Sequence, residues 1–146
     1  MRNYTTISLF SLFILSAILL PAQSAEKTLV KSFNLDGNQL VELFLAGDVE
    51  VQEWNNPILR IQMSLSLPNG NNAMLKSLIQ GGRYNLKGES TAEEYEIKSP
   101  NLQKKITVGG QELHEKVSYL VYAPTNVIIK LADSTTANAL NSKESF

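Results

Sequence analysis

Apolar and polar residues alternate along one stretch of this chain more strictly than anywhere else. In "ILRIQMSLSL", residues 58–67, the side chains of Leu59, Ile61, Met63, Leu65 and Leu67 share one register. Successive side chains of a strand point to opposite faces of a sheet, so the stretch is predicted to have one buried and one wet face. Each such side chain, if fully buried, contributes roughly 1.5–3 kcal/mol before entropy is counted. We therefore expect this stretch to be a core strand, not a binding site.

Shorter strand patterns recur on both sides of it, with Gly, Pro, Asn and Ser between them. In residues 39–54, two strand-like runs surround "AGD", and Val49 and Val51 of the second run share a face. Short strands separated by turn residues favour a mainly antiparallel or rolled β-architecture. The predicted strands are residues 28–35, the two runs within 39–54, 58–67, 83–89, 93–99, 104–108, 116–123 and 126–131.

The period changes in "NNAMLKSLIQGG", where Met74, Leu75, Leu78 and Ile79 recur at helical spacing. Asn71 or Asn72 suits the helix start, and the following glycines suit its end. Glycines that cradle phosphate precede a helix, so these do not predict a phosphate site. The sequence predicts one short helix near residues 72–80.

Together these patterns predict a mainly β fold with a single domain over residues 26–132. About eight or nine short strands would form a β-sandwich or a β-roll or β-helix-like stack, and one helix is too few for a doubly wound α/β fold. Residues 133–146 are polar, lack a strand pattern and are expected to be a flexible tail.

The N-terminus reads as an export signal over residues 1–25. Arg2 precedes an apolar run over residues 7–20, Pro21 breaks the helix, and "AQSA" allows cleavage after Ser24 or Ala25. The alternative is an uncleaved membrane anchor, but the run is shorter than the roughly 20 residues that a span needs. We expect an exported protein of the periplasm, cell surface or medium, without a stable membrane span after cleavage.

Charge and cysteine usage exclude several classes. The chain has 13 Lys+Arg and 14 Asp+Glu, and removal of Arg2 with the signal leaves 12 against 14. Nucleic-acid binding needs clustered positive charge, so no nucleic-acid partner is expected. The chain has no cysteine, which excludes disulfides and lipid attachment at a Cys.

The chain has few residues in arrangements that suit catalysis. His114 is the single histidine and is flanked by Glu112 and Glu115, whereas metal sites and nucleophilic triads need more partners at defined spacing. No Gly-x-Ser-x-Gly motif occurs. The carboxylate pairs at 93–94 and at 112 and 115 lack the apolar surroundings that raise the pKa of a general acid. We expect no enzyme activity and no cofactor or metal.

Aromatic residues are the better candidates, because their rings stack on sugars or anchor protein interfaces. The candidates are Trp54, Tyr84, Tyr95, Tyr119 and Tyr122, of which Trp54, Tyr84, Tyr119 and Tyr122 are assigned to a possible binding surface. Each also has a structural interpretation, and Trp54 after its strand favours a plug at the end of a β-core. The strand containing Tyr119 and Tyr122 is apolar on both faces, which indicates a central strand or an interface.

The phrases "AGDVEVQEW", "NAMLKSLI" and "VSYLVYAPTNVIIKL" resemble the N-terminal portion of the adhesin-like β-domain family of exported bacterial proteins, similar to autotransporter adhesin heads. Tyr119, Val121, Pro124 and Val127 match a family phrase with slightly compressed spacing. The resemblance spans about residues 28–131 and implies a right-handed β-roll or β-helix-like stack, often followed by repeated coils. Here the Gly-Asp-Val signature occurs once, so the chain resembles the capping portion alone or closes its sheet differently.

Two functions follow as expectations. The first is an exported, non-catalytic β-domain in protein–protein interaction or adhesion at the cell envelope, where a sheet edge or apolar face pairs with another envelope or extracellular protein. The alternative is a soluble module that binds an envelope or extracellular polysaccharide near Trp54.

Overall fold

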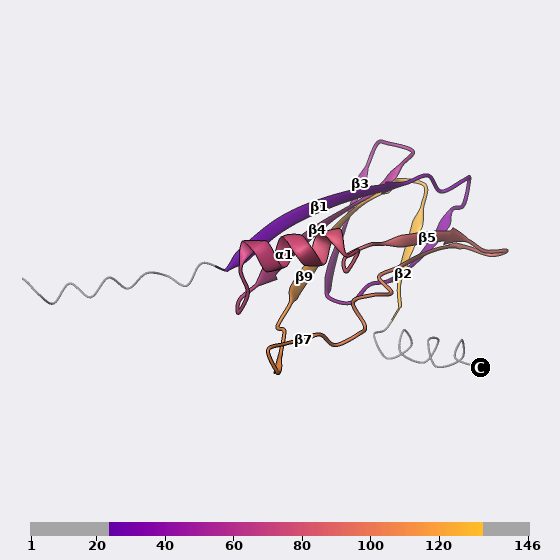
Figure 1. Cartoon of the computed structure of the whole chain (residues 1–146). Coiled ribbons are helices and arrows are strands. Elements are labelled where there is room, and N and C mark those ends of the chain that lie inside the picture. Colours follow the sequence, from indigo (N-terminus) through magenta and orange to yellow (C-terminus); the bar gives the residue numbers. More distant parts are fainter. Residues whose placement is uncertain (1–23, 133–146) are drawn as a thin grey trace, which may run out of the picture.

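The computed structural model describes residues 24–132. The predicted tail and nearly all of the predicted export signal lie outside the described residues. The described part is mainly β, with one short helix and two four-stranded sheets packed face to face (Figure 1), which confirms the predicted fold class. It contains ten strands, more than the eight or nine expected.

The first sheet has the strand order β1 (Ala25–Phe33), β4 (Leu59–Leu67), β9 (Lys116–Pro124) and β3 (Asp48–Trp54). β1 and β9 flank β4 in antiparallel pairing, whereas β3 runs parallel to β9. β4 is the strictly alternating stretch, and its five apolar side chains are at most 3% exposed. The prediction of a core strand is confirmed, because one face of β4 lies entirely between the two sheets.

The second sheet has the order β10 (Ile128–Leu131), β2 (Leu40–Phe44), β6 (Tyr95–Lys98) and β5 (Lys87–Ser90). The first three strands are parallel, and β5 closes the far edge in antiparallel pairing. Val41, Leu43 and Ile97 are almost fully buried and face the first sheet. The fold is therefore a sandwich with a common core.

Two short connections place the edge strands β3 and β10 at the same end of the sandwich. β2 passes into β3 across the two sheets through residues 45–47, and β9 passes into β10 through residues 125–127. β2 is the neighbour of β10, and β9 is the neighbour of β3. Each connection thus joins the outermost strand of one sheet to the next-to-outermost strand of the other. These two edge strands border one lateral side of the sandwich, which we call the open end.

The helix α1 (Asn72–Gln80) lies at the opposite end, beside β1 (Figure 1). Its bounds match the prediction, and the Asn71 side chain caps it by accepting a hydrogen bond from the Met74 N–H. Leu75 is buried, and Leu78 and Ile79 pack against the core. No helix within residues 24–132 has the length and apolar character needed to cross a membrane.

The chain after the helix departs from the prediction of a strand over residues 83–89. Gly82 adopts φ +77°, and the N–H groups of Arg83 and Asn85 donate to the carbonyls of Leu78 and Gly82. These local hydrogen bonds replace a strand ladder, and β5 begins only at Lys87.

The predicted strand over residues 104–108 is likewise reduced. It contains the two-residue strand β7 (Thr107–Val108), paired with the unexpected β8 (Gln111–Glu112). Gly109 and Gly110 both have positive φ and form the turn between them. This hairpin accounts for the excess over the predicted number of strands.

Candidate functional site

The open end leaves part of the apolar core uncovered. Val49 and Val51 of β3 are in register with Tyr119 and Val121, and Leu131 of β10 is in register with Leu43, so all three share the inward faces. Val121 and Leu43 are at most 1% exposed, whereas Val51 is 39% and Leu131 is 54% exposed. Within residues 24–132, no further strand covers these outermost inward side chains.

The backbone at this end is also unpaired. Among the described residues, β3 pairs only with β9, and β10 pairs only with β2. Outer backbone N–H and C=O groups of an edge strand are free to accept another strand. The open end thus combines two available strand edges with an apolar strip between them.

The β3 edge carries negative charge. Asp48, Glu50 and Glu53 are exposed, and the strand contains no lysine or arginine. Asp48 and Glu50 are in register with Ser118 and Leu120 and therefore lie on the outer face of the first sheet. β10 has one charged residue, Lys130, whose Nζ lies 3.8 Å from Glu94 Oε2.

The structure separates the predicted aromatic surface into two groups. Tyr84 and Tyr119 are buried in the core, as is Tyr95, so the expectation that Tyr84 and Tyr119 form an exposed surface is wrong. Burial raises the pKa of Tyr119 to about 12. The inward register of Tyr119 beside β3, and the turn that follows Gly82, direct these rings away from solvent.

Trp54 and Tyr122 are only partly buried and do lie together. Their ring centroids are 5.4 Å apart, and the Arg60 guanidinium lies 4.7 Å from the Trp54 ring centroid. The Trp54 indole N–H donates to the Ile58 carbonyl over 3.0 Å. The indole thus fastens the end of β3 to the following turn, and its polar N–H already has an acceptor.

A buried ionic network holds the long segment between β6 and β9. Arg83 donates to both carboxylate oxygens of Glu115 and to the Asn101 carbonyl, and the Tyr84 hydroxyl donates to Glu115 over 2.7 Å. Burial, the hydrogen bond to Glu115 and its negative charge raise the pKa of Tyr84 above its usual range.

Beside this network, a cleft of about 1170 Å³ lies between the segment and the first sheet, and the exposed His114 is among its lining residues. The His114 N–H donates to the Asn69 side chain. No cysteine or second histidine exists in the chain to act with His114.

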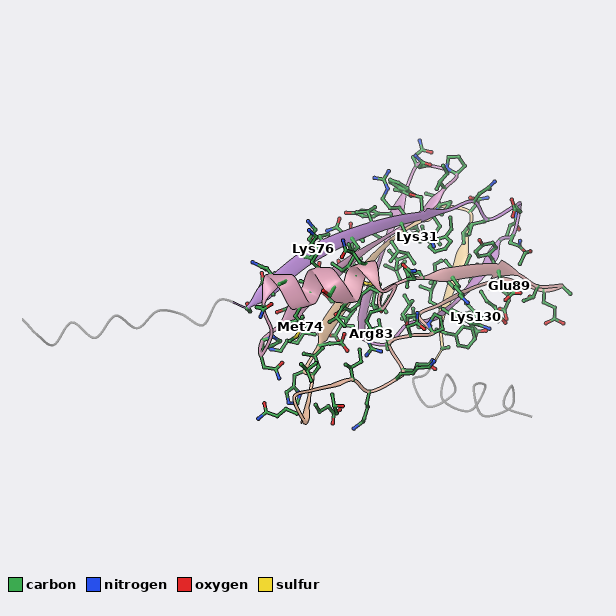
Figure 2. The ribbon with its side chains drawn as sticks, viewed as in Figure 1. Lys31, Met74, Lys76, Arg83, Glu89 and Lys130 are labelled. Carbon is green, nitrogen blue, oxygen red and sulfur yellow. The ribbon has the colours of Figure 1, made fainter. Side chains whose placement is uncertain are left out.

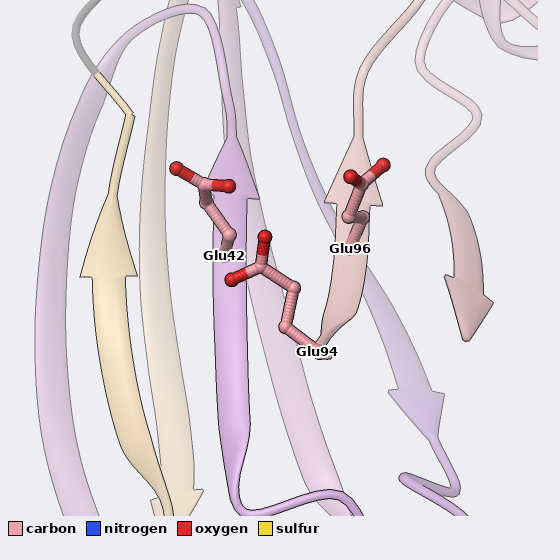
Figure 3. A group of neighbouring side chains, drawn as sticks. All are labelled: Glu42, Glu94 and Glu96. Carbon is pink, nitrogen blue, oxygen red and sulfur yellow. The ribbon is translucent and has the colours of Figure 1, made fainter. Parts of the chain in front are cut away.

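Three glutamates of the second sheet converge, which sequence reasoning missed (Figure 3). Carboxylate oxygens of Glu42, Glu94 and Glu96 lie within 4.8 Å of one another. Oxygen ligands of this kind suit a hard divalent cation, but lysines also approach the group, with Lys130 near Glu94 and Lys98 paired to Glu96. The only sequence signal is Glu42 inside the apolar run "LVELF".

Burial is the main cause of a raised pKa at Glu42, and the hydrogen bond to Glu94 and the charge of Glu94 add to it. Glu42 and Glu96 are brought together by the parallel register of β2 and β6. Since this register joins residues from distant parts of the sequence, a strand-by-strand analysis does not reveal it.

Comparisons with protein-family models, curated proteins and solved structures found no match to this chain. The function is therefore inferred from the geometry of the described residues. Of the surfaces above, the open end is the one at which backbone hydrogen-bonding groups and apolar side chains are unpartnered together.

Proposed function

We propose that this protein is an exported, non-catalytic interaction domain of the cell envelope, which binds another exported protein by strand addition at the open end. The observation that carries the proposal is the exposure of the inward side chains Val51 and Leu131 at the edges of β3 and β10, which no other strand of residues 24–132 pairs with or covers. Strand addition supplies main-chain hydrogen bonds for affinity and pockets for alternate side chains for specificity.

The opposite edges of the two sheets, β1 and β5, are less suited to strand addition, which supports the open end as the binding site. β1, the other edge of the first sheet, packs beside α1, and the Lys31 ammonium donates to the Leu86 carbonyl over 2.6 Å (Figure 2). β5, the other edge of the second sheet, has only four residues and is exposed along its length. β3 offers a seven-residue edge whose inner face carries Val49 and Val51, with Glu53 at its end, and such edges are normally covered or paired.

Export is part of the proposal and rests on the leader-like residues 1–25. Ala25 is buried and pairs with Leu67 in β1. Cleavage after Ser24 leaves this strand intact, whereas cleavage after Ala25 removes a buried residue. We expect the secreted chain to begin at Ala25, which intact-mass measurement of exported protein will test, and a start at Glu26 would contradict the expectation.

Site-specific photo-crosslinking in intact cells tests the interaction. A photoreactive residue replaces Val51 or Ile128 at the open end, and Val108 serves as control because it is similarly exposed but lies in the β7–β8 hairpin. We expect a discrete protein adduct from the first two positions and not from Val108. Equal crosslinking at all three positions, or none at the open end, would refute the proposal.

Binding of an envelope or extracellular polysaccharide is the second candidate, favoured by the contact of the partly exposed Trp54 and Tyr122 rings. Under this function, Trp54→Ala abolishes polysaccharide binding while the domain stays folded. If the ring is mainly structural, the same change destabilises the domain by up to roughly 3–5 kcal/mol. Polysaccharide pull-down and urea unfolding of Trp54→Ala distinguish a binding role of the ring from a structural one.

A further inference from the structure

We infer that the open end takes a positively charged, extended segment of its partner, in which apolar residues alternate with lysine or arginine, and that this segment pairs with β3. The inference rests on the proposed function and deepens it by naming the chemistry of the partner. It follows because the inward and outward side chains of β3 favour different residue types in a neighbouring strand.

Next to Val49 and Val51, the inner face of β3 requires apolar side chains in the added segment. A strand added beside β3 places alternate residues next to Val49 and Val51, over the uncovered edge of the core. Leu131 of β10 borders the same strip from the opposite sheet. Polar side chains at these positions would be buried without partners, so the inward residues of the added segment are apolar.

The outer face requires positive side chains. Asp48, Glu50 and Gln52 occupy the outward positions of β3, and both carboxylates are exposed. Opposite charges on neighbouring strands stabilise a sheet and like charges destabilise it. Lysine or arginine at the outward positions of the added segment therefore complements β3.

β3 is the better acceptor of the two edges at the open end. It has seven residues, whereas β10 has four. The outward charge of β10 is Lys130, which lies beside Glu94 and would repel a basic segment. The charge pattern therefore assigns the basic segment to the first sheet.

A second copy of this chain is a poorer occupant. Pairing β3 with β3 of another copy brings two acidic strands together, which like-charge repulsion disfavours. The cationic edge is β1, with Lys27 and Lys31, but α1 packs beside it and Lys31 already donates to the Leu86 carbonyl. Charge complementarity thus favours a different protein.

Two synthetic peptides test the inference with purified residues 25–146. Both have nine residues and blocked termini; one alternates valine with lysine and the other alternates valine with glutamate. We expect the lysine peptide to bind at least tenfold more tightly, measured by fluorescence anisotropy, with affinity that falls as salt is added. Glu50→Lys should weaken this binding at least tenfold, whereas the control Glu89→Lys, an exposed acid on β5 (Figure 2), should not change it.

Val51→Lys places a charge in the apolar strip and should abolish binding, with Val108→Lys as its control. Circular dichroism checks that each variant is folded. Equal binding of both peptides, lost in Val51→Lys, would overturn the charge inference and keep strand addition as the proposed function. If neither peptide binds but a protein adduct forms at Val51 in cells, the charge inference is likewise overturned and strand addition is kept as the proposed function. Self-association that Val51→Lys abolishes would overturn the inference in favour of a second copy.

Discussion

Arg83 is a buried cation whose charge is paired with one carboxylate, that of Glu115. Its side chain is 8% exposed and that of Glu115 is 12% exposed, with 2.6 Å between Arg83 Nη2 and Glu115 Oε2. Because the Tyr84 hydroxyl donates to the same carboxylate, loss of Glu115 would leave two buried donors without their partner. These hydrogen bonds connect residues that are far apart in the sequence and anchor the segment that carries the β7–β8 hairpin.

We predict that Glu115→Ala destabilises the domain by about 3–5 kcal/mol, since it leaves the Arg83 charge buried and unpaired. Glu112→Ala is the matched control, because its pair with Lys105 is exposed and such pairs contribute about 0–1 kcal/mol. Urea unfolding of both variants measures the difference. Similar losses of stability would show that the network does not hold the segment in place.

Glu42 makes stability depend on pH. Its pKa is raised in the folded state by burial and by Glu94, so the folded state binds this proton more tightly than the unfolded state does. The corresponding stability is present below the unfolded pKa, about 4.3, and is lost as pH rises through the folded pKa. We predict that Glu42→Gln melts at a higher temperature than the native chain near pH 7, and that the difference disappears below about pH 4. Thermal melts across this range, with Glu53→Gln as an exposed control, will check it; a pH-independent difference would contradict it.

The burial of individual side chains can be predicted from the sequence where apolar and polar residues alternate strictly. The alternate apolar side chains from Leu59 to Leu67 are buried as predicted, but Tyr84, an aromatic candidate for a binding surface, is buried as well. The backbone turns after Gly82, which rotates Tyr84 toward Glu115. The Glu42 group was missed for a different reason, since its members meet only through strand pairing.

At the element scale, Gly47 controls how closely β2 and β3 pass the start of β9. Its φ is +140°, and a Cβ there would lie 2.2 Å from the Val117 carbonyl oxygen. Glycine tolerates such φ values at little steric cost. The turn between the two sheets therefore depends on both the backbone conformation and the small volume of this residue.

We predict that Gly47→Ala destabilises the domain more than Gly109→Ala. Gly109 also has positive φ, +59°, but a Cβ there meets no atom within 4 Å. The control should lose about 1–2 kcal/mol from strain alone, and Gly47→Ala should lose roughly 1–3 kcal/mol more from overpacking. Chemical denaturation of the pair tests this; equal losses would mean that the turn shifts away from Val117 freely.

The positions of the helix and strands can be predicted from the sequence better than the pairing of the strands. The helix over residues 72–80 follows from local spacing and caps, and β4 follows from alternation. Neither pattern specifies which strands pair, because alternation identifies a buried face and not the neighbouring strand. The parallel pairings of β3 with β9 and of β2 with β10 join segments that are far apart in the sequence, so strand patterns alone do not reveal the open end.

At the scale of the whole molecule, the two ends of the sandwich differ in what covers them. β1 and β3 are the two edges of one sheet, with nine and seven residues. α1 packs beside β1, whereas among residues 24–132 no strand or helix covers the outer edge of β3. This difference, more than any single side chain, separates a protected end from one that is available to a partner.

Hydrogen exchange should report this asymmetry directly. Amides exchange through local opening, whose free energy is small where few apolar contacts cover the backbone. We predict fast exchange in β3 and β10, slower exchange in β1, and the slowest in β4 and β9, which are paired on both sides. If β3 instead exchanges as slowly as β1, a segment outside residues 24–132 or another chain covers it, and protection that fades on dilution then indicates a second copy. Protection of β3 that appears only when the lysine peptide is added would locate binding at the open end.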